Sequence, residues 1–310
     1  VNLPIGTTAL LLGAFLVPTS RDPNQGKIDP LGAVLSFVGL ASLLFGIIEG
    51  PSKGWTDTLV VGSFALAVVA IAAFVVWEMR TPHPMLDLSV FQNPRFSAGS
   101  GTITIVFFAM FGSMLLMTQY WQLVHGYSPL EAGIRLLPYA ATMMVVAPLS
   151  ARFVERLGTK RVVLTGLSLV VTGMLLLSTI ASDSPYPIVI GYFMVMAAGM
   201  GMTMAPATEA VMGSLPRAKA GVGSAINDTT RQVGGALGVA VIGTIVSSVY
   251  SARILDLGAV FDLTSGQVAQ AESSLGGAQS LAASLGDQAG AFAAAASDGF
   301  VDALSIGLRI

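Results

Sequence analysis

Asp228 and Arg231 lie well inside a long apolar segment, where a charged side chain is costly and normally faces a polar cavity or a partner. Their spacing of three residues places them on one face of a helix. A carboxylate beside a cation can bind or release a proton, and protonation of Asp228 would free Arg231. The helix would then have two electrostatic states that a proton can select. A permanent ion pair that fixes helix packing is the alternative interpretation.

Glu209 extends this candidate charge network to the preceding apolar segment. It sits toward the end of that segment, at an estimated depth similar to that of Arg231 across a short connection. Glu209 is therefore a candidate to share Arg231. The alternative is that its flexible stem carries the carboxylate to the membrane surface.

Five further polar residues are candidates for lining a small-molecule cavity. Amide groups in an apolar segment need hydrogen-bond partners, and in the segment 97–124 they gather near its end. Two more amides stand beside the charged pair. The predicted cavity residues are Gln119, Tyr120, Gln122, Asn227 and Gln232.

A charged connection of about ten residues joins two apolar segments at Arg152–Arg161. Carboxylate and guanidinium groups at the ends of neighbouring helices can hold one conformation closed, and a glycine permits the turn between them. The predicted latch residues are Glu155, Arg156, Gly158, Lys160 and Arg161. The alternative is that these charges only orient the chain in the membrane.

The chain shows no recognisable catalytic or metal-binding constellation. It contains no cysteine, which excludes disulfides and thiolate zinc sites within these residues. His83 and His125 stand in connections without other ligands nearby in sequence. No nucleophile stands beside a base, so neither an enzyme nor a cofactor or metal is expected.

A net charge of −2 without a basic stripe gives no expectation of nucleic-acid binding. Solitary charges disfavour a channel lined by charged rings.

The elements that position these residues are long and apolar. The chain is 54% hydrophobic and 10% charged, whereas a globular domain carries about 25% charge, so lipid is the expected solvent. Crossing a membrane takes about 20 helical residues, and such segments must be helices because lipid leaves unpaired amides unsatisfied. The sequence predicts an all-α polytopic membrane protein of about eight spans plus a partial one. The predicted spans are 1–18 (the end of one), 30–48, 58–77, 97–124, 134–151, 162–182, 184–208, 220–250 and 299–310 (the start of one).

Basic residues sort onto alternate sides of these spans. Cytoplasmic connections retain positive charge, so the richer side is predicted to face the cytoplasm and the protein to lie in the cell membrane. The segments 125–133 and 183–187 and the stretch after Tyr250 would then be external. The richer side holds Arg21, Lys27, Arg80, Arg95, Arg152, Arg156, Lys160, Arg161, Arg217 and Lys219, and the other side holds Lys53 and Arg253.

The stretch 251–298 differs from the rest in its alanine, glycine, serine and glutamine content. It is too polar to span a membrane and too long for a turn, so it is predicted to be an external loop. Weak helical periodicity at 267–275 and 278–285 indicates short amphipathic helices near the membrane surface. A disordered low-complexity linker is the alternative. In the predicted span 220–250, the glycines at 234 and 238 favour a close approach of that helix to a neighbouring helix.

Several motifs resemble the major facilitator superfamily, and in particular its fourteen-spanner drug:proton antiporters. The charged loop Arg152–Arg161 is similar to the second copy of the superfamily's cytoplasmic loop motif, and two additional spans precede the connection Arg80–Phe96, as in that branch. The other matching stretches are Val1–Gly6, Gly126–Gly133 continuing to Leu136–Pro138, Ala205–Ala210 and Ala220–Gly238.

The resemblance assigns a place to each part of the chain within a major facilitator helix bundle. It implies that 1–18 ends helix six, 19–79 holds two inserted helices and 80–96 is a cytoplasmic linker. The segment 97–250 would be the C-terminal bundle, 251–298 the external loop and 299–310 the start of the last helix. The N-terminal half of the same polypeptide, with the antiporter motif of helix five, is then expected as a partner.

The implied activity is proton-coupled export of hydrophobic or amphipathic drug-like molecules by alternating access between two bundles. A dedicated exporter of a self-made metabolite, such as an antibiotic or siderophore, is the alternative. The partners implied are a small-molecule substrate, protons and the lipid bilayer.

Overall fold

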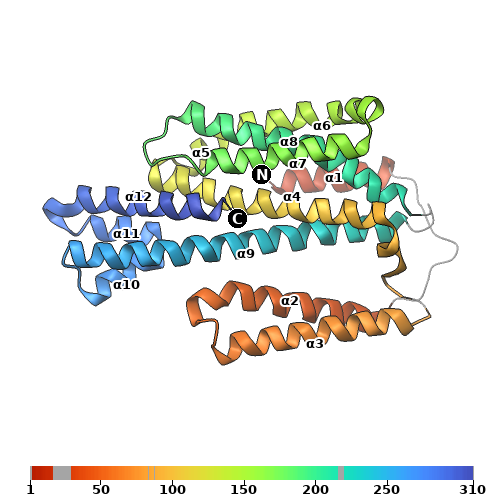
Figure 1. Ribbon diagram of the computed structural model, residues 1–310, viewed down its shortest axis with the longest axis horizontal. Coiled ribbons are helices and arrows are strands. Elements are labelled where there is room, and N and C mark those ends of the chain that lie inside the picture. The colour runs from red at the N-terminus through yellow and green to blue at the C-terminus, as the bar shows by residue number, and fades with distance from the viewer. Residues whose placement is uncertain (1, 17–28, 83, 87, 216–219, 310) are drawn as a thin grey trace.

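The fold of the chain is seen in a computed structural model that describes residues 2–16, 29–82, 84–86, 88–215 and 220–309. All regular elements in these residues are helices (Figure 1). Seven of the described helices are long and apolar enough to cross a membrane, and Gly6–Leu16 is a shorter apolar helix. The predicted all-α architecture is confirmed. The predicted Arg21, Lys27, Arg217 and Lys219 of the basic side lie outside the described residues.

The membrane-length helices follow the predicted apolar segments closely. Each begins or ends within a few residues of its prediction, and polar caps fix several ends, as Asn93 does by accepting from the backbone N–H of Arg95. The elements are α1 Asn2–Leu16, α2 Pro30–Lys53, α3 Thr58–Arg80, η1 Leu88–Gln92, α4 Pro94–Gln119, the π-helical turn η2 Tyr120–Val124, α5 Pro129–Arg135, α6 Leu137–Leu157, α7 Thr159–Leu177, α8 Tyr186–Gly213, α9 Ala220–Val260, α10 Ser265–Ser273, α11 Leu275–Ala282, η4 Gly286–Gln288 and α12 Ala289–Gly307.

Helices α4 and α9 pack in parallel through small residues. A side chain at Gly234 or Gly238 would strike the backbone of Thr104 or Phe108 on α4. Gly235 is covered by the ring of Phe111, 3.0 Å from where a Cβ would lie. The glycines therefore let the two backbones touch, which confirms the close approach predicted from their spacing.

Helices α7 and α8 make a second close contact. A Cβ at Gly199 would lie 2.6 Å from the backbone nitrogen of Val170, and one at Gly173 would lie 2.7 Å from that of Met196. Helix α6 covers the other side of α8, where the ring of Tyr139 stacks on Phe193 with centroids 4.5 Å apart. Helix α8 is thereby enclosed, which explains why its methionines Met196 and Met200 are fully buried.

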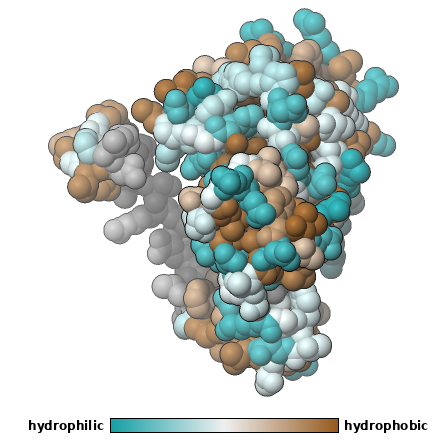
Figure 2. Space-filling model, turned by 90° about the vertical axis from the view of Figure 1, so that its left-hand side faces the viewer, coloured by the Kyte–Doolittle hydropathy of each residue, from teal (hydrophilic) through white to brown (hydrophobic). Residues whose placement is uncertain are grey.

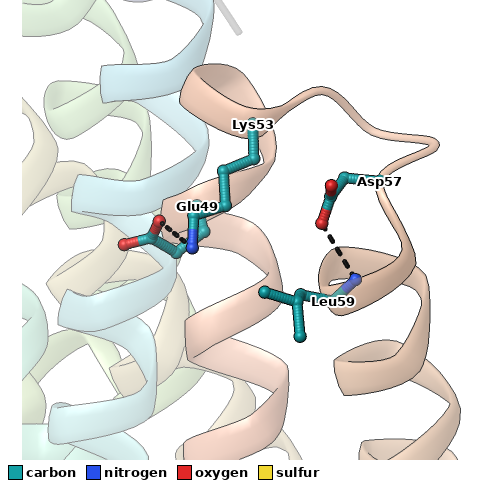
Figure 3. A network of polar contacts seen from close by, with 4 residues as sticks. All are labelled: Glu49, Lys53, Asp57 and Leu59. Atoms are coloured by element: carbon teal, nitrogen blue, oxygen red, sulfur yellow. Dashed lines mark hydrogen bonds and ion pairs between the residues drawn. The ribbon is translucent and has the colours of Figure 1, made fainter.

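Helices α2 and α3 form a hairpin that lies beside the bundle and packs on α9 (Figure 1). Its turn is fixed by two local contacts, shown in Figure 3. Lys53 Nζ lies 3.3 Å from Glu49 Oε2, and Asp57 accepts from the backbone N–H of Leu59 at 2.9 Å. Many apolar side chains of the hairpin are exposed, among them Phe37 and Val68, as expected for helices that face lipid.

The stretch 251–298 is folded in the structure, so the disordered-linker alternative is wrong for it. Helix α9 continues ten residues past its predicted end at Tyr250, because Ile254 is buried and Ser251 donates to Glu272 Oε1 at 2.6 Å. Helices α10 and α11 form where weak periodicity predicted them, with Thr264 capping α10. Hydrophilic side chains cover much of this end of the molecule (Figure 2).

The last helix begins earlier than predicted. Helix α12 starts at Ala289, not at Gly299, because an alanine-rich run favours helix and Phe292 and Ala296 are fully buried. It packs along α9, where Arg253 Nη2 lies 3.4 Å from Asp302 Oδ2. The predicted loop is therefore shorter than 251–298 and mostly helical.

Candidate functional site

Arg231 points into the junction of three helices. From α9 its Nη2 donates to Thr208 Oγ1 of α8 at 3.3 Å, and its guanidinium carbon lies 5.5 Å from the ring centroid of Phe107 on α4. The side chain is half-buried, and its Nε is buried without a hydrogen-bond partner. Arg231 therefore has a hydroxyl and an aromatic face as neighbours and retains one unused donor.

Asp228 does not pair with Arg231 in this structure, so the predicted permanent ion pair is not present. Asp228 is exposed on α9, and no ion pair joins the two side chains. A spacing of three residues permits such a pair, but the two side chains diverge by about 60° around the helix axis. Thr208 and Phe107 hold Arg231 on the inner side of that angle.

Glu209 is exposed and does not share Arg231 either. Its neighbour Thr208 faces Arg231 instead, and the next residue along a helix points about 100° away. Of the predicted charge network, the structure therefore brings Arg231 alone into the helix junction.

Asn227 lies one helical turn before Arg231 and shares its face. Its side chain is 6% exposed, and its Oδ1 is buried without a hydrogen-bond partner. A buried polar atom normally has a partner, so two unsatisfied groups on one face mark a polar site inside the bundle. This site is made of Asn227, Arg231 and Thr208.

The predicted cavity residues do not form one cavity. The glycine contacts pair Gly234 with Thr104 and Gly238 with Phe108, so Arg231 lies level with residue 101 of α4. Gln119 is eighteen residues farther along α4, or about 27 Å at 1.5 Å per residue. Gln119 and Gln122 are half-buried at that far end, whereas Gln232 is exposed near Arg231.

Tyr120 is a core residue and not a cavity residue. Its ring is fully buried, and its hydroxyl donates to the carbonyl of Ala181 at 2.8 Å. This bond ties the end of α4 to the connection between α7 and α8. The sequence placed Tyr120 among the cavity residues because it stands between two amides that need partners, but the folded chain supplies its hydroxyl with a backbone acceptor.

Three of the five predicted latch residues line a cleft at the start of α4 and α7 and the end of α8. The cleft has a volume of about 1300 Å³, and Glu209 stands on its wall with Gly158, Lys160 and Arg161. Arg95, at the start of α4, adds a third cation. Gly158 has a φ of +82°, a conformation that favours glycine, and it turns α6 into α7. Glu155 and Arg156 are exposed and unpaired in this state.

A cluster at the opposite end was not predicted. The guanidinium carbon of Arg135 lies 3.8 Å from the ring centroid of Tyr127, and Tyr186 donates its hydroxyl to the carbonyl of Arg135 at 2.9 Å. His125 stacks on Tyr127 with centroids 5.5 Å apart, and burial together with the charge of Arg135 lowers the pKa of His125. His125, Tyr127 and Arg135 are close in sequence, whereas Tyr186 lies fifty-one residues beyond Arg135 and joins them only through the fold.

The described residues contain no group of three or more histidine, aspartate, glutamate or cysteine side chains that could hold a metal ion.

Comparison with known proteins places this arrangement in a family. The family model of the Major Facilitator Superfamily matches residues 2–239. The chain belongs to the Major Facilitator Superfamily. As a superfamily member with seven long apolar helices in its described residues, it is a multi-pass protein of the cell membrane.

Its relatives in the superfamily include named drug exporters. It is 33% identical over 254 residues to the multidrug resistance protein Stp of Mycobacterium tuberculosis, covering 82% of this chain and 47% of that protein. It is 32% identical over 285 residues to the multidrug efflux pump LfrA of Mycolicibacterium smegmatis, covering 92% and 56%. The tetracenomycin C resistance and export protein of Streptomyces glaucescens is 32% identical over 249 residues, covering 80% and 46%. The chain spans about half the length of these relatives.

A solved structure has a similar fold. It is that of a bacterial homologue of the human lysosomal transporter Spinster, in an inward-facing and unoccupied conformation. The TM-score is 0.53 at 18% identity, and the match covers 89% of this chain and 60% of that one.

Proposed function

We propose that the protein exports hydrophobic or amphipathic drug-like molecules from the cell in exchange for protons. The polar site of Asn227, Arg231 and Thr208 carries the proposal, because it puts unsatisfied polar atoms inside an otherwise apolar helix bundle. Buried polar groups in a membrane are costly, and they are typical of substrate and proton pathways. Relatives named as multidrug exporters support the substrate class.

The hairpin α2–α3 supports a place in the fourteen-spanner branch of the superfamily. It precedes α4, lies beside the bundle and adds two membrane-length helices to it. Such an additional pair is the feature that the sequence resemblance associated with drug:proton antiporters.

Asp228 is the proposed proton-binding carboxylate in this half of the molecule. In the described conformation Arg231 is turned toward Thr208, which leaves its Nε unused. An ionised Asp228 can attract Arg231 once the helices move, whereas a protonated Asp228 cannot. Proton binding would thereby select between two positions of Arg231, and alternating access would couple those positions to substrate.

A dedicated metabolite exporter is the second candidate. One relative is named as a tetracenomycin C resistance and export protein, so self-resistance is compatible with a chain of this kind. The same polar site would then serve a single substrate.

Transport by the full-length protein in proteoliposomes tests the proposal. An imposed pH gradient should drive accumulation of a cationic dye, and Asp228→Asn should abolish gradient-driven uptake while downhill exchange persists. Asp256→Asn, an exposed carboxylate elsewhere on α9, is the matched control and should transport normally. Gradient-driven transport that survives in Asp228→Asn would refute the coupling role. Uptake of one metabolite and no dye would favour the second candidate.

A further inference from the structure

Two buried carboxylates meet at one end of the α2–α3 hairpin. Asp29, which caps α2, is 8% exposed, and Glu78, in the last turn of α3, is 4% exposed. A Cβ built on Gly32 would lie 2.6 Å from both Asp29 Oδ2 and Glu78 Oε1. The two oxygens therefore lie within 5.2 Å of each other, twice that distance. Gly32, which has no side chain, leaves the space between them open.

The two carboxylates have unequal hydrogen-bond partners. Asp29 accepts from the Nε1 of Trp77, at 2.8 Å to Oδ2 and 3.0 Å to Oδ1, and from the backbone N–H of Gly32 at 2.9 Å. Glu78 Oε2 accepts from the backbone N–H of Leu86 at 2.9 Å. Glu78 Oε1 is buried with no hydrogen-bond partner. Asp29 is thus provided with donors that suit a negative charge, while Glu78 has an oxygen that lacks one.

The described neighbours supply this pair with no cation. Asp29 is the charged group that borders the space at Gly32 together with Glu78. Arg80, on the same helix, is exposed, and Glu49 and Lys53 pair at the opposite end of α2. The other charged groups on the described parts of the adjoining elements are Arg95 after η1 and Asp228, Arg231, Arg253 and Asp256 on α9. Arg21, Asp22, Lys27, His83 and Asp87 lie outside the described residues.

A metal ion fits this pair poorly. Hard cations take six or more oxygen ligands, and no third carboxylate, histidine or cysteine joins Asp29 and Glu78 among the described residues. A proton needs a single acceptor, so it suits Glu78 Oε1 better.

We propose that Asp29 and Glu78 form a proton-binding site, in which a proton on Glu78 Oε1 is shared with Asp29 Oδ2. Two carboxylates this close and this buried cannot both ionise without large repulsion and desolvation cost. A proton taken from water removes the second charge, and it converts the unpartnered acceptor into a donor that faces Asp29.

The site connects the hairpin to the bundle. Leu86, whose N–H is held by Glu78, packs against a cluster of buried residues at the ends of α4, α8 and α9. Loss of the proton would separate the start of α2 from the end of α3 and disturb this attachment. The cluster contains Phe96, Ile103, Ala207, Val211 and Ile226. The site is separate from Asp228 and does not depend on its coupling role.

Infrared difference spectroscopy tests the site without any transport. The purified full-length protein in lipid nanodiscs is taken from about pH 5 to about pH 10, and the loss of the protonated-carboxyl band is recorded. The band should titrate in the wild type and be missing in Glu78→Gln, whose amide oxygen still accepts from Leu86. Glu49→Gln, the same change at the opposite end of the hairpin, is the control and should keep the band.

Asp29→Asn provides a second measurement, which tests the proton-binding site even if Glu78→Gln fails to fold. It removes the neighbouring charge, so Glu78 should release its proton at a pH lower by about one unit or more. The indole of Trp77 gives a parallel signal, obtained as the fluorescence difference from Trp77→Phe. An unchanged band in Glu78→Gln, no shift in Asp29→Asn, or proton release by sodium at constant pH would each overturn the proposal.

Discussion

Arg231 of α9 donates to Thr208 of α8 at 3.3 Å, although an acidic residue, Asp228, stands three positions away on its own helix. The contact crosses between helices, whereas the expected ion pair would have stayed within one. Arg231 therefore fastens α9 to α8 in this conformation. Its buried, unused Nε shows that this arrangement does not satisfy the guanidinium completely. A second arrangement with another partner is thus available to it.

This geometry predicts that the contact of Arg231 with Thr208 stabilises the protein more than the carboxylate of Asp228 does. Thr208→Val removes the acceptor of a charged donor and should lower the free energy of unfolding by about 1.5–3 kcal/mol. Asp228→Asn should change it by less than about 0.5 kcal/mol, because Asp228 is exposed and unpaired. Thermal melting of the purified full-length protein measures both. Equal losses in the two variants would mean that Asp228 has a structural partner after all.

The glycine contacts of α9 give a graded packing prediction. Gly238→Ala would push a methyl group into the carbonyl of Phe108 and should destabilise the protein by about 1–3 kcal/mol. Gly243→Ala is the control, since its Cβ would meet Leu115 at an ordinary 3.8 Å and alanine favours helix. Melting temperatures that do not distinguish the two variants would contradict the close α4–α9 contact.

The residues of the predicted latch are exposed and unpaired in the described state. We predict that they form a latch in another conformation of the transport cycle. Arg156→Ala should therefore reduce transport several-fold while expression and melting temperature stay unchanged. Lys53→Ala, which removes a basic residue at the other end of the bundle, is the control and should transport normally. Wild-type transport in Arg156→Ala would leave these charges an orienting role only.

His125 predicts a pH dependence of the cluster around Tyr127. Burial and Arg135 lower the pKa of His125, so the folded protein binds this proton less readily than the unfolded chain does. The neutral imidazole of His125 therefore stabilises the folded protein fully above the ordinary pKa of 6.5. This stabilisation is lost as the pH falls below 6.5 and through the lower pKa that His125 has in the folded protein. His125→Gln should flatten the melting temperature between about pH 7.5 and about pH 5.5. An equally steep loss in that variant would assign the effect to another group.

Membrane orientation stays a prediction from the charge asymmetry, and cysteine labelling measures it. Thr159→Cys, beside the cleft, should be protected from an impermeant thiol reagent in intact cells, and Gly266→Cys, in α10, should be labelled. Each single cysteine is introduced into a full-length protein from which any other cysteines have been removed. Labelling of position 159 from outside would reverse the orientation.

The sequence alone determined the class of protein and the course of its membrane helices. Lipid allows a chain of this composition few structures other than helices, so apolar length sufficed to find α2, α3, α6 to α8 and the start of α9 within about six residues. Spacing alone also identified the contact surface of Gly234 and Gly238, because only small residues let two helix backbones touch. The weak periodicity after Tyr250 was a correct signal for α10 and α11.

The tertiary structure decided which polar groups meet. Arg231 contacts Thr208 and Phe107 and does not contact Asp228. Helix packing, and not sequence separation, determines which side of α9 is enclosed. Tyr120 found a backbone acceptor sixty-one residues away at Ala181, which no local pattern could reveal. The sequence did not predict a site at Asp29 and Glu78, because a carboxylate at either end of an apolar helix is ordinary. Asp29 precedes α2, and Glu78 lies in the last turn of α3. Only the antiparallel hairpin brings both to Gly32, since it returns α3 to the point where α2 began.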